Sequence, residues 1–190
     1  MSRISLLDPT QRGGLQERIA PYRDFRQRVD RFLSTHFGEH CTRNCFTNRL
    51  SACCSKDGIV TFWADGVINA LSASAAQMED LFQALQQPHH PQKCTYLGPA
   101  GCRWEVRPLM CAMFLCDPVQ ARVFEGRKDT EAAWEALQQE AKGYRWPDRP
   151  VLFDWLETYF MEMGCRSPLM YINHSPGLLR IKRQGLRNTR

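Results

Sequence analysis

Eight of the nine cysteines in this chain stand in two short groups, and no other feature limits its fold and chemistry as strongly. The first group, CTRNCFTNRLSACC, runs from Cys41 to Cys54, and the second, CTYLGPAGCRWEVRPLMCAMFLC, runs from Cys94 to Cys116. Cysteines this close in sequence serve as disulfide staples, as redox pairs or as metal ligands.

The length and composition of the chain make disulfide staples unnecessary for folding. With 190 residues, 43% of them hydrophobic, a single domain over residues 1–190 can bury its own core. The first residues, MSRISLLDPTQRGG, contain no apolar run of about seven or more residues as in a signal peptide, and no segment approaches the roughly 18 apolar residues of a membrane span. We therefore expect a soluble, cytoplasmic protein with no membrane partner, whose thiols stay reduced.

Reduced, clustered thiols point to metal binding, because thiolate is a soft ligand for zinc and for iron-sulfur clusters. Both kinds of centre usually take four protein ligands, so eight cysteines match two centres, or one centre with extra thiols. Neither group contains the CxxC of a zinc ribbon or the CxxCxxC of bacterial ferredoxins, which leaves both metals open. The predicted metal ligands are Cys41, Cys45, Cys53, Cys54, Cys94, Cys102, Cys111 and Cys116.

The adjacent pair Cys53-Cys54 indicates how the ligands divide. Successive side chains of extended backbone point to opposite sides, so two neighbours seldom bind one tetrahedral ion. We expect one of the pair to join a centre with Cys41 and Cys45, and the other to meet a centre completed by the second group. Metal would then hold residues 41–116 together as a cysteine-cluster core and contribute to the free energy of folding.

Four arginines stand near the cysteines, at positions 43, 49, 103 and 107. A centre with four thiolates carries a formal charge of about −2, whether it holds zinc or an oxidised four-iron cluster. Arginine side chains that donate to the sulfurs would offset this charge. We expect an internal partner for Arg107, which precedes Pro108, whereas Arg43 and Arg49 fit a solvated position equally well.

Other side chains near the groups have two interpretations each. His40 is either a substitute ligand or a loop residue, and the isolated Cys165 is either a buried thiol or a ninth ligand or reactive group. Tyr96, Trp104 and Phe114 either exclude water from a cluster or fill a small core.

No nucleophile and base stand in a recognisable catalytic arrangement, so catalytic residues stay unknown and the sequence leaves open whether the protein is an enzyme.

Local patterns predict several helices and short strands. A helix is expected over residues 21–38, a strand from Ile59 to Trp63, and a helix that follows the capping box of Ser74 and Gln77 and is closed by Pro88. Further helices are expected after caps at Thr130 and Asp148, ending at Gly143 and Gly164, followed by a hairpin around residues 175–177. The fold class is therefore α+β, mainly α-helical with short strands, in a compact single domain organised around a cysteine-ligated metal centre.

The end of the chain is basic. Residues 178–190, LLRIKRQGLRNTR, hold four Arg, one Lys and no acidic residue, and the net charge of the whole chain is +5. Such a tail attracts nucleic acid or an acidic protein surface, but it is more often a solvated end. We expect no nucleic-acid partner and leave a protein partner open.

The second cysteine group resembles a known family. Its C-x7-C, the following aromatic residue, Arg107-Pro108 and the C-x4-C look like the C-terminal half of the YkgJ-type cysteine-cluster family, and Cys53-Cys54 matches the CC pair of that family's N-terminal half. The resemblance covers about residues 41–116 and implies a zinc- or iron-chelating domain. The family usually spaces its first cysteines more tightly than Cys41 and Cys45, so the second group carries the resemblance.

The sequence thus predicts a metal-binding protein, with zinc or an iron-sulfur cluster in a structural or electron-transfer role. We favour the iron-sulfur cluster, because thiol-only ligation with aromatic shielding suits a redox centre. One alternative is a metal-supported, protein-modifying enzyme related to the flagellin lysine methylases that longer family members resemble, although no glycine-rich loop follows a predicted strand. Another is a zinc-stabilised module that binds nucleic acid or protein.

Overall fold

The computed structural model describes residues 2–40, 54–55, 61–88, 92–99, 101–145 and 152–170. This part of the chain is mainly helical and contains one two-stranded antiparallel sheet, which confirms the predicted mainly α-helical class with short strands. None of its helices is both long and apolar enough to cross a membrane. The helices are α1 (Ser2–Ser5), α2 (Pro9–Gly38), α4 (Trp63–Ser72), α5 (Ala75–Gln86), α6 (Leu109–Met113), α7 (Asp117–Phe124), α8 (Lys128–Arg145) and α9 (Leu152–Glu162), and the strands are β1 (Leu97–Gly98) and β2 (Gly101–Cys102).

Helix α2 is longer than the sequence pattern predicted. The expected start at Pro21 is wrong, because the helix begins at Pro9 and Pro21 lies inside it. Asp8 and Gln11 form a capping box in which the Asp8 carboxylate accepts from the Gln11 N–H at 2.8 Å and the Gln11 side chain accepts from the Asp8 N–H at 3.2 Å. Since Pro9 occupies a position that needs no N–H donor, this cap starts the helix twelve residues before Pro21.

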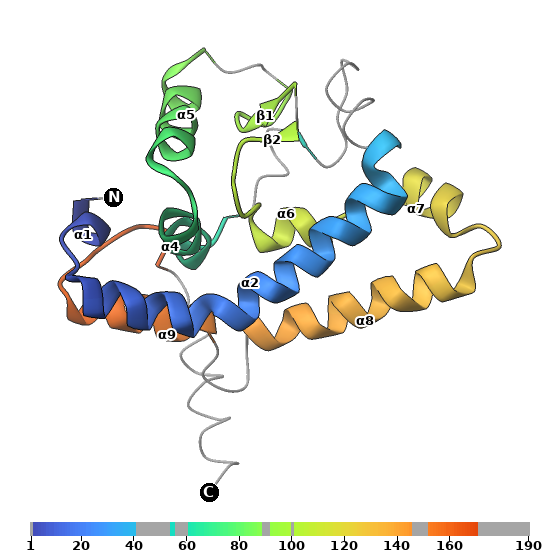
Figure 1. The fold of residues 1–190 in the computed structure, drawn as a ribbon. Helices are drawn as coiled ribbons and strands as arrows, with labels where there is room; N and C mark the ends of the chain where they lie inside the picture. The colour runs from blue at the N-terminus through green and yellow to red at the C-terminus, as the bar shows by residue number, and fades with distance from the viewer. Residues whose placement is uncertain are drawn as a thin grey trace, which may run out of the picture.

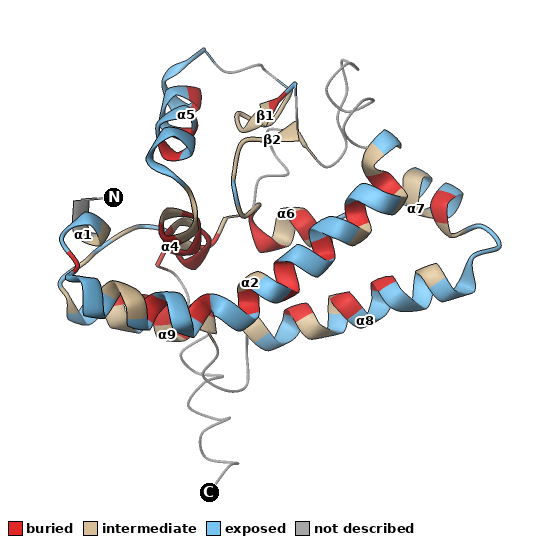
Figure 2. Cartoon of the chain, in the orientation of Figure 1, coloured by how far each residue is buried: buried red, intermediate tan, exposed pale blue. Residues whose placement is uncertain are grey.

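The hydrophobic core follows α2 along its length. One side of α2 packs against α8 and α9, and the other side faces α4, α6 and α7, while α5 and the β1–β2 hairpin lie beyond α4 and α6 (Figure 1). Aromatic rings join these layers: Tyr22 meets Phe153 at 5.5 Å between ring centroids, and Phe32 stacks on Trp134 at 5.5 Å. Figure 2 shows the buried stripe of α2, whose apolar members are Leu15, Ile19, Tyr22, Phe25, Val29, Leu33 and Phe37.

Helix α4 replaces the end of the strand that was expected from Ile59 to Trp63. Trp63 is its first residue, so the prediction is wrong there, and Ile59 and Val60 lie outside the described residues. The carboxylate of Asp65 accepts from the Phe62 N–H at 2.9 Å and so caps the first turn. The helix is buried around most of its circumference, and its buried residues are Ala64, Asp65, Val67, Ile68, Asn69 and Leu71.

The capping box ahead of α5 is confirmed. Ser74 and Gln77 exchange side-chain and backbone hydrogen bonds, and the helix ends at Gln86, two residues before Pro88. The structure thus forms this helix where the local signals placed it.

The two C-terminal helices differ from their predicted limits. Helix α8 begins before Thr130, at Lys128, and continues past Gly143 to Arg145, so neither residue bounds it. Helix α9 stops at Glu162, and Gly164 follows with a φ of 80°, which a glycine adopts readily after a helix. Asp148, the expected hairpin around residues 175–177 and the basic tail over 178–190 lie outside the described residues.

Candidate metal centre

Backbone pairing brings the first cysteine group to the second. The N–H of Cys94 donates to the carbonyl of Cys54 at 2.8 Å, and Ser55 and Lys93 form an isolated antiparallel bridge. Cys54, the one residue of the first group that the structure describes, therefore lies beside the start of the second group, some forty residues away in sequence.

A small hairpin and a short helix place the other thiols. Leu97 of β1 faces Cys102 of β2, and the N–H of Leu97 donates to the Cys94 carbonyl at 3.1 Å, so Cys94 and Cys102 belong to one compact turn. Cys111 lies in α6. Electrostatic effects connect these thiols: Cys102 interacts with Cys94 and Cys54, and Cys94 interacts with Cys111. We call Cys54, Cys94, Cys102 and Cys111 the thiol cluster.

Burial makes thiolates in this cluster costly without a cation. Desolvation, with smaller contributions from the nearby Cys94 and Cys54, raises the pKa of the Cys102 thiol to about 11, against the opposing effects of the Trp104 N–H and the Arg107 guanidinium. Desolvation also raises the pKa of Cys94, and Cys111 adds to that increase. Deprotonation of several of these half-buried thiols together therefore requires a positive charge among them.

Arg107, for which the sequence predicted an internal partner, is half-buried near Cys102. Its guanidinium is close enough to Cys102 to lower the pKa of that thiol, and its buried Nε has no hydrogen-bond partner among the described residues. Arg103 instead forms an ion pair with the Asp80 carboxylate at 2.6 Å. Arg107 is thus the arginine that the structure places at the thiol cluster, whereas Arg103 joins the hairpin to α5.

The backbone between Cys102 and Cys111 is held by three buried polar side chains. Asn69 Oδ1 accepts from the Val106 N–H at 3.0 Å, and Asp65 Oδ1 accepts from the Leu109 N–H at 3.0 Å. The guanidinium of Arg26, which is 1% exposed, donates to the Arg107 carbonyl at 2.7 Å. We call residues 106–109 the anchored segment, because side chains from α2 and α4 fix both its ends and its middle.

The aromatic residues near the second group divide into two kinds. Tyr96 and Trp104 are half-buried and meet edge to face, with 5.4 Å between ring centroids. Phe114 is 58% exposed, so it does not fill a core. The half-buried aromatic residues of the second group are therefore Tyr96 and Trp104.

The remaining predicted site residues lie at other points of the chain or outside the described residues. Cys116 is the residue before α7, where its carbonyl accepts from the N–H groups of Val119 and Gln120. Cys165 follows α9, and His40 is half-buried just after α2. The candidate ligands Cys41, Cys45 and Cys53, and also Arg43 and Arg49, lie outside the described residues. Within the described part, no three His, Cys, Asp or Glu side chains converge closely enough to hold a metal ion.

Comparison with known proteins identifies no relative. No protein-family model matches the chain. Neither a curated protein nor a solved structure is significantly similar to it. The function of the protein is therefore inferred from its own residues and their contacts.

Sequence reasoning missed the polar residues that hold the anchored segment. Asp65 and Asn69 stand four residues apart in an otherwise apolar helix, and a pair of polar groups on one helical face is a signal of a buried contact. Their partners are 44 and 37 residues away, and the partner of Arg26 is 81 residues away. Local patterns contain no information about contacts at that separation.

Proposed function

We propose that the protein binds metal through the thiol cluster, with Cys54, Cys94, Cys102 and Cys111 as the ligands of one zinc ion or iron-sulfur cluster. The observation that supports the proposal is the backbone hydrogen bond that joins Cys54 to Cys94, together with the raised pKa values of Cys94, to which Cys111 contributes, and of Cys102, to which Cys94 and Cys54 contribute. Four thiolates are the usual complement of either centre. The resemblance of the second group to the YkgJ-type family supports Cys94, Cys102 and Cys111 as ligands, and Cys116 with them.

The electrostatics of the thiol cluster support a cation there. Buried thiols whose pKa values are raised give up their protons when a metal ion supplies positive charge, so binding would exchange protons for metal. A metal-bound sulfur would also accept from the buried Nε of Arg107, which has no acceptor among the described residues. Both features fit a site that is completed by a metal centre.

The role we propose is structural or electron-transferring, within a cytoplasmic single domain. Tyr96, whose pKa is raised by desolvation and by Cys94 and Cys102, and Trp104, whose ring meets that of Tyr96, would exclude water from an iron-sulfur centre. The buried anchoring of residues 106–109 gives the rigidity that either role needs. The remaining cysteines of the first group, Cys41, Cys45 and Cys53, would serve a second centre or complete the first, together with Cys116.

Metal analysis of matched cysteine variants tests the proposal. The wild-type protein, Cys102→Ser and Cys165→Ser are purified without oxygen, and zinc, iron and the visible spectrum are measured for each. We expect Cys102→Ser to lose at least half of the bound metal and Cys165→Ser to keep it, because Cys165 lies outside the thiol cluster. Equal loss in both variants, or a wild-type protein that takes up neither metal, contradicts the proposal. Colourless protein with about two zinc ions and no iron would eliminate the electron-transfer role.

A further inference from the structure

Cys54 and Cys94 lie directly opposite each other in a short antiparallel pairing. Ser55 pairs with Lys93, so Cys54 and Cys94 are the next opposite residues in this register, and the Cys94 N–H donates to the Cys54 carbonyl at 2.8 Å. Opposite residues carry their side chains on the same face, with about 5.5 Å between the Cα atoms of a hydrogen-bonded pair. This separation falls within the roughly 4.4–6.8 Å that disulfides span. The backbone therefore places these two thiols within reach of a disulfide bond.

The other two members of the thiol cluster are placed differently. Cys102 of β2 faces Leu97 of β1, and Cys111 lies in α6. Within the described residues, no second pair of cysteines stands opposite each other across paired backbone. Cys54 and Cys94 are only half-buried, so a small reagent can reach them. The geometry thus selects one pair from the four thiols.

We propose that Cys54 and Cys94 form a reversible disulfide with a low-molecular-weight disulfide as oxidant when the thiol cluster holds no metal, so that oxidation and metal binding exclude each other at these two thiols. The exclusion rests on the proposed function, because a sulfur in a disulfide is no longer a thiolate that can bind metal. The disulfide itself does not depend on that function. It would keep the two cysteine groups joined in the metal-free protein and restrict the unfolded chain.

The chemistry is thiol–disulfide exchange in two steps. One protein thiolate attacks a sulfur of the oxidant, whose S–S bond breaks, so a mixed disulfide forms and one thiol leaves. The second cysteine then loses its proton and attacks the protein sulfur of the mixed disulfide, which releases the other half of the oxidant as a thiol. The two protein thiols lose two electrons and two protons, and the oxidant is reduced to two thiols. Because the second cysteine is already held opposite the first, the second step is intramolecular and fast.

Disulfide mapping of the full-length protein tests the proposal. Metal is removed with a chelator, the protein is incubated with oxidised glutathione, and the remaining thiols are blocked with iodoacetamide. The pH is about 8.5, because desolvation raises the pKa of Cys94 and a higher pH increases its thiolate fraction. Trypsin leaves Cys54 in the peptide LSACCSK and Cys94 in CTYLGPAGCR. We expect the link between these two peptides to be at least about fivefold more abundant than any other, since only these thiols are held in position.

Each of the two peptides contains a second cysteine, which provides matched controls. Cys53→Ser and Cys102→Ser should keep the link between the peptides, whereas Cys54→Ser and Cys94→Ser should lower it at least about tenfold. A chain that lacked the pairing would instead link cysteines close in sequence, such as Cys94 and Cys102, because short loops close at a lower cost in entropy.

The same measurement on the protein with its metal tests the exclusion. Protein purified without oxygen, with its zinc or iron content measured, should form the Cys54–Cys94 link at least about fivefold more slowly than the metal-free protein. Links scattered among other cysteines, an unchanged link in Cys54→Ser or Cys94→Ser, or equal rates with metal bound and removed would each overturn this proposal. A protein that takes up neither metal would instead contradict the proposed function, and the exclusion with it.

Discussion

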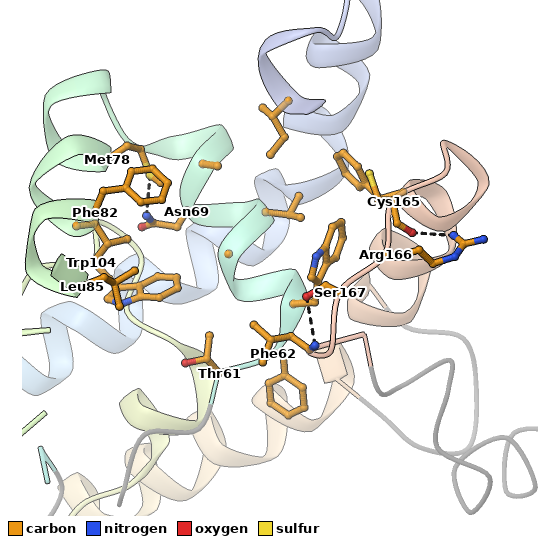
Figure 3. Close-up of a pocket in the computed structure, with 18 of the residues that line it drawn as sticks. Thr61, Phe62, Asn69, Met78, Phe82, Leu85, Trp104, Cys165, Arg166 and Ser167 are labelled. Carbon is orange, nitrogen blue, oxygen red and sulfur yellow. Dashed lines mark hydrogen bonds between the residues drawn. The ribbon is translucent and has the colours of Figure 1, made fainter. Parts of the chain in front are cut away.

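The anchored segment and a large apolar pocket, which is lined by α4, α5 and the chain after α9 (Figure 3), differ in whether their buried polar groups are hydrogen-bonded. In the anchored segment, Asp65, Asn69 and Arg26 each bind a backbone group between Val106 and Leu109. In the pocket, the Thr61 hydroxyl and the Trp104 indole N–H are buried with no partner among the described residues. Hydrogen bonds between distant segments therefore hold the anchored segment, although Nε and Nη2 of Arg26 are themselves buried without a hydrogen-bond partner among the described residues. The two polar atoms of the pocket lining form no such bond, so they do not stabilise the structure around them.

The largest expected effect comes from breaking the anchored segment at Asp65. Asp65→Ala leaves the buried N–H groups of Phe62 and Leu109 without an acceptor, so we expect the free energy of unfolding to fall by about 3 kcal/mol. Urea unfolding measures this change. Asp80→Ala is the control, because Asp80 is half-exposed and its ion pair with Arg103 is at the surface, and its loss should be below about 1 kcal/mol. Similar losses in the two variants would show that the Asp65 contacts do not hold the segment.

Sequence patterns predicted the structural features that depend on residues close together in the chain. The capping box of Ser74 and Gln77 depends on neighbouring residues, and the structure forms it as predicted. The strand to Trp63 was mispredicted because the β-prone run hid the cap that Asp65 provides three residues after Phe62. That single carboxylate also binds Leu109, 44 residues away, a contact that gives no local signal.

At the candidate metal centre and the pocket, too, the sequence did not predict contacts between residues far apart in the chain. Cysteine spacing drew attention to the second group, and the internal partner expected for Arg107 from its place before Pro108 and Cys111 stays a prediction. The pocket was not foreseen, since its walls come from segments as distant as Ile4 and Leu169. Trp104 was singled out only as a shield or core residue, because an unsatisfied indole N–H becomes visible only when its surroundings are known.

The second largest expected effect is a pH dependence of the free energy of unfolding that comes from Asp65. Burial raises the pKa of its carboxyl to about 6, against the opposing effects of the Phe62 and Leu109 N–H groups and of Arg26. The Asp65 carboxyl therefore stays protonated in the folded protein at pH values where the same group in the unfolded chain, with a pKa of about 3.9, has lost its proton. This contribution to stability is present at low pH and is lost as the pH rises through 6.

Comparison of the wild-type protein with Asp65→Asn isolates that contribution from other titrating groups. Between pH 7 and pH 4.5 the free energy of unfolding of the wild-type protein should rise by about 2 kcal/mol relative to the variant, which has no carboxyl at this position. Urea unfolding at both pH values provides the measurement. A constant difference between the two proteins would mean that Asp65 titrates at its ordinary pKa.

The smallest effect is expected in the pocket and has the opposite sign. Thr61→Val replaces a buried hydroxyl by a methyl group of nearly the same shape, and that hydroxyl has no partner among the described residues. Since no hydrogen bond is lost and an unsatisfied polar group is removed, the free energy of unfolding should stay the same or rise by up to about 1 kcal/mol. Thermal unfolding of both proteins without any added ligand measures the change. Destabilisation by more than about 1 kcal/mol would show that the Thr61 hydroxyl is bound as firmly as the groups of the anchored segment, and the contrast between the two regions would then fail.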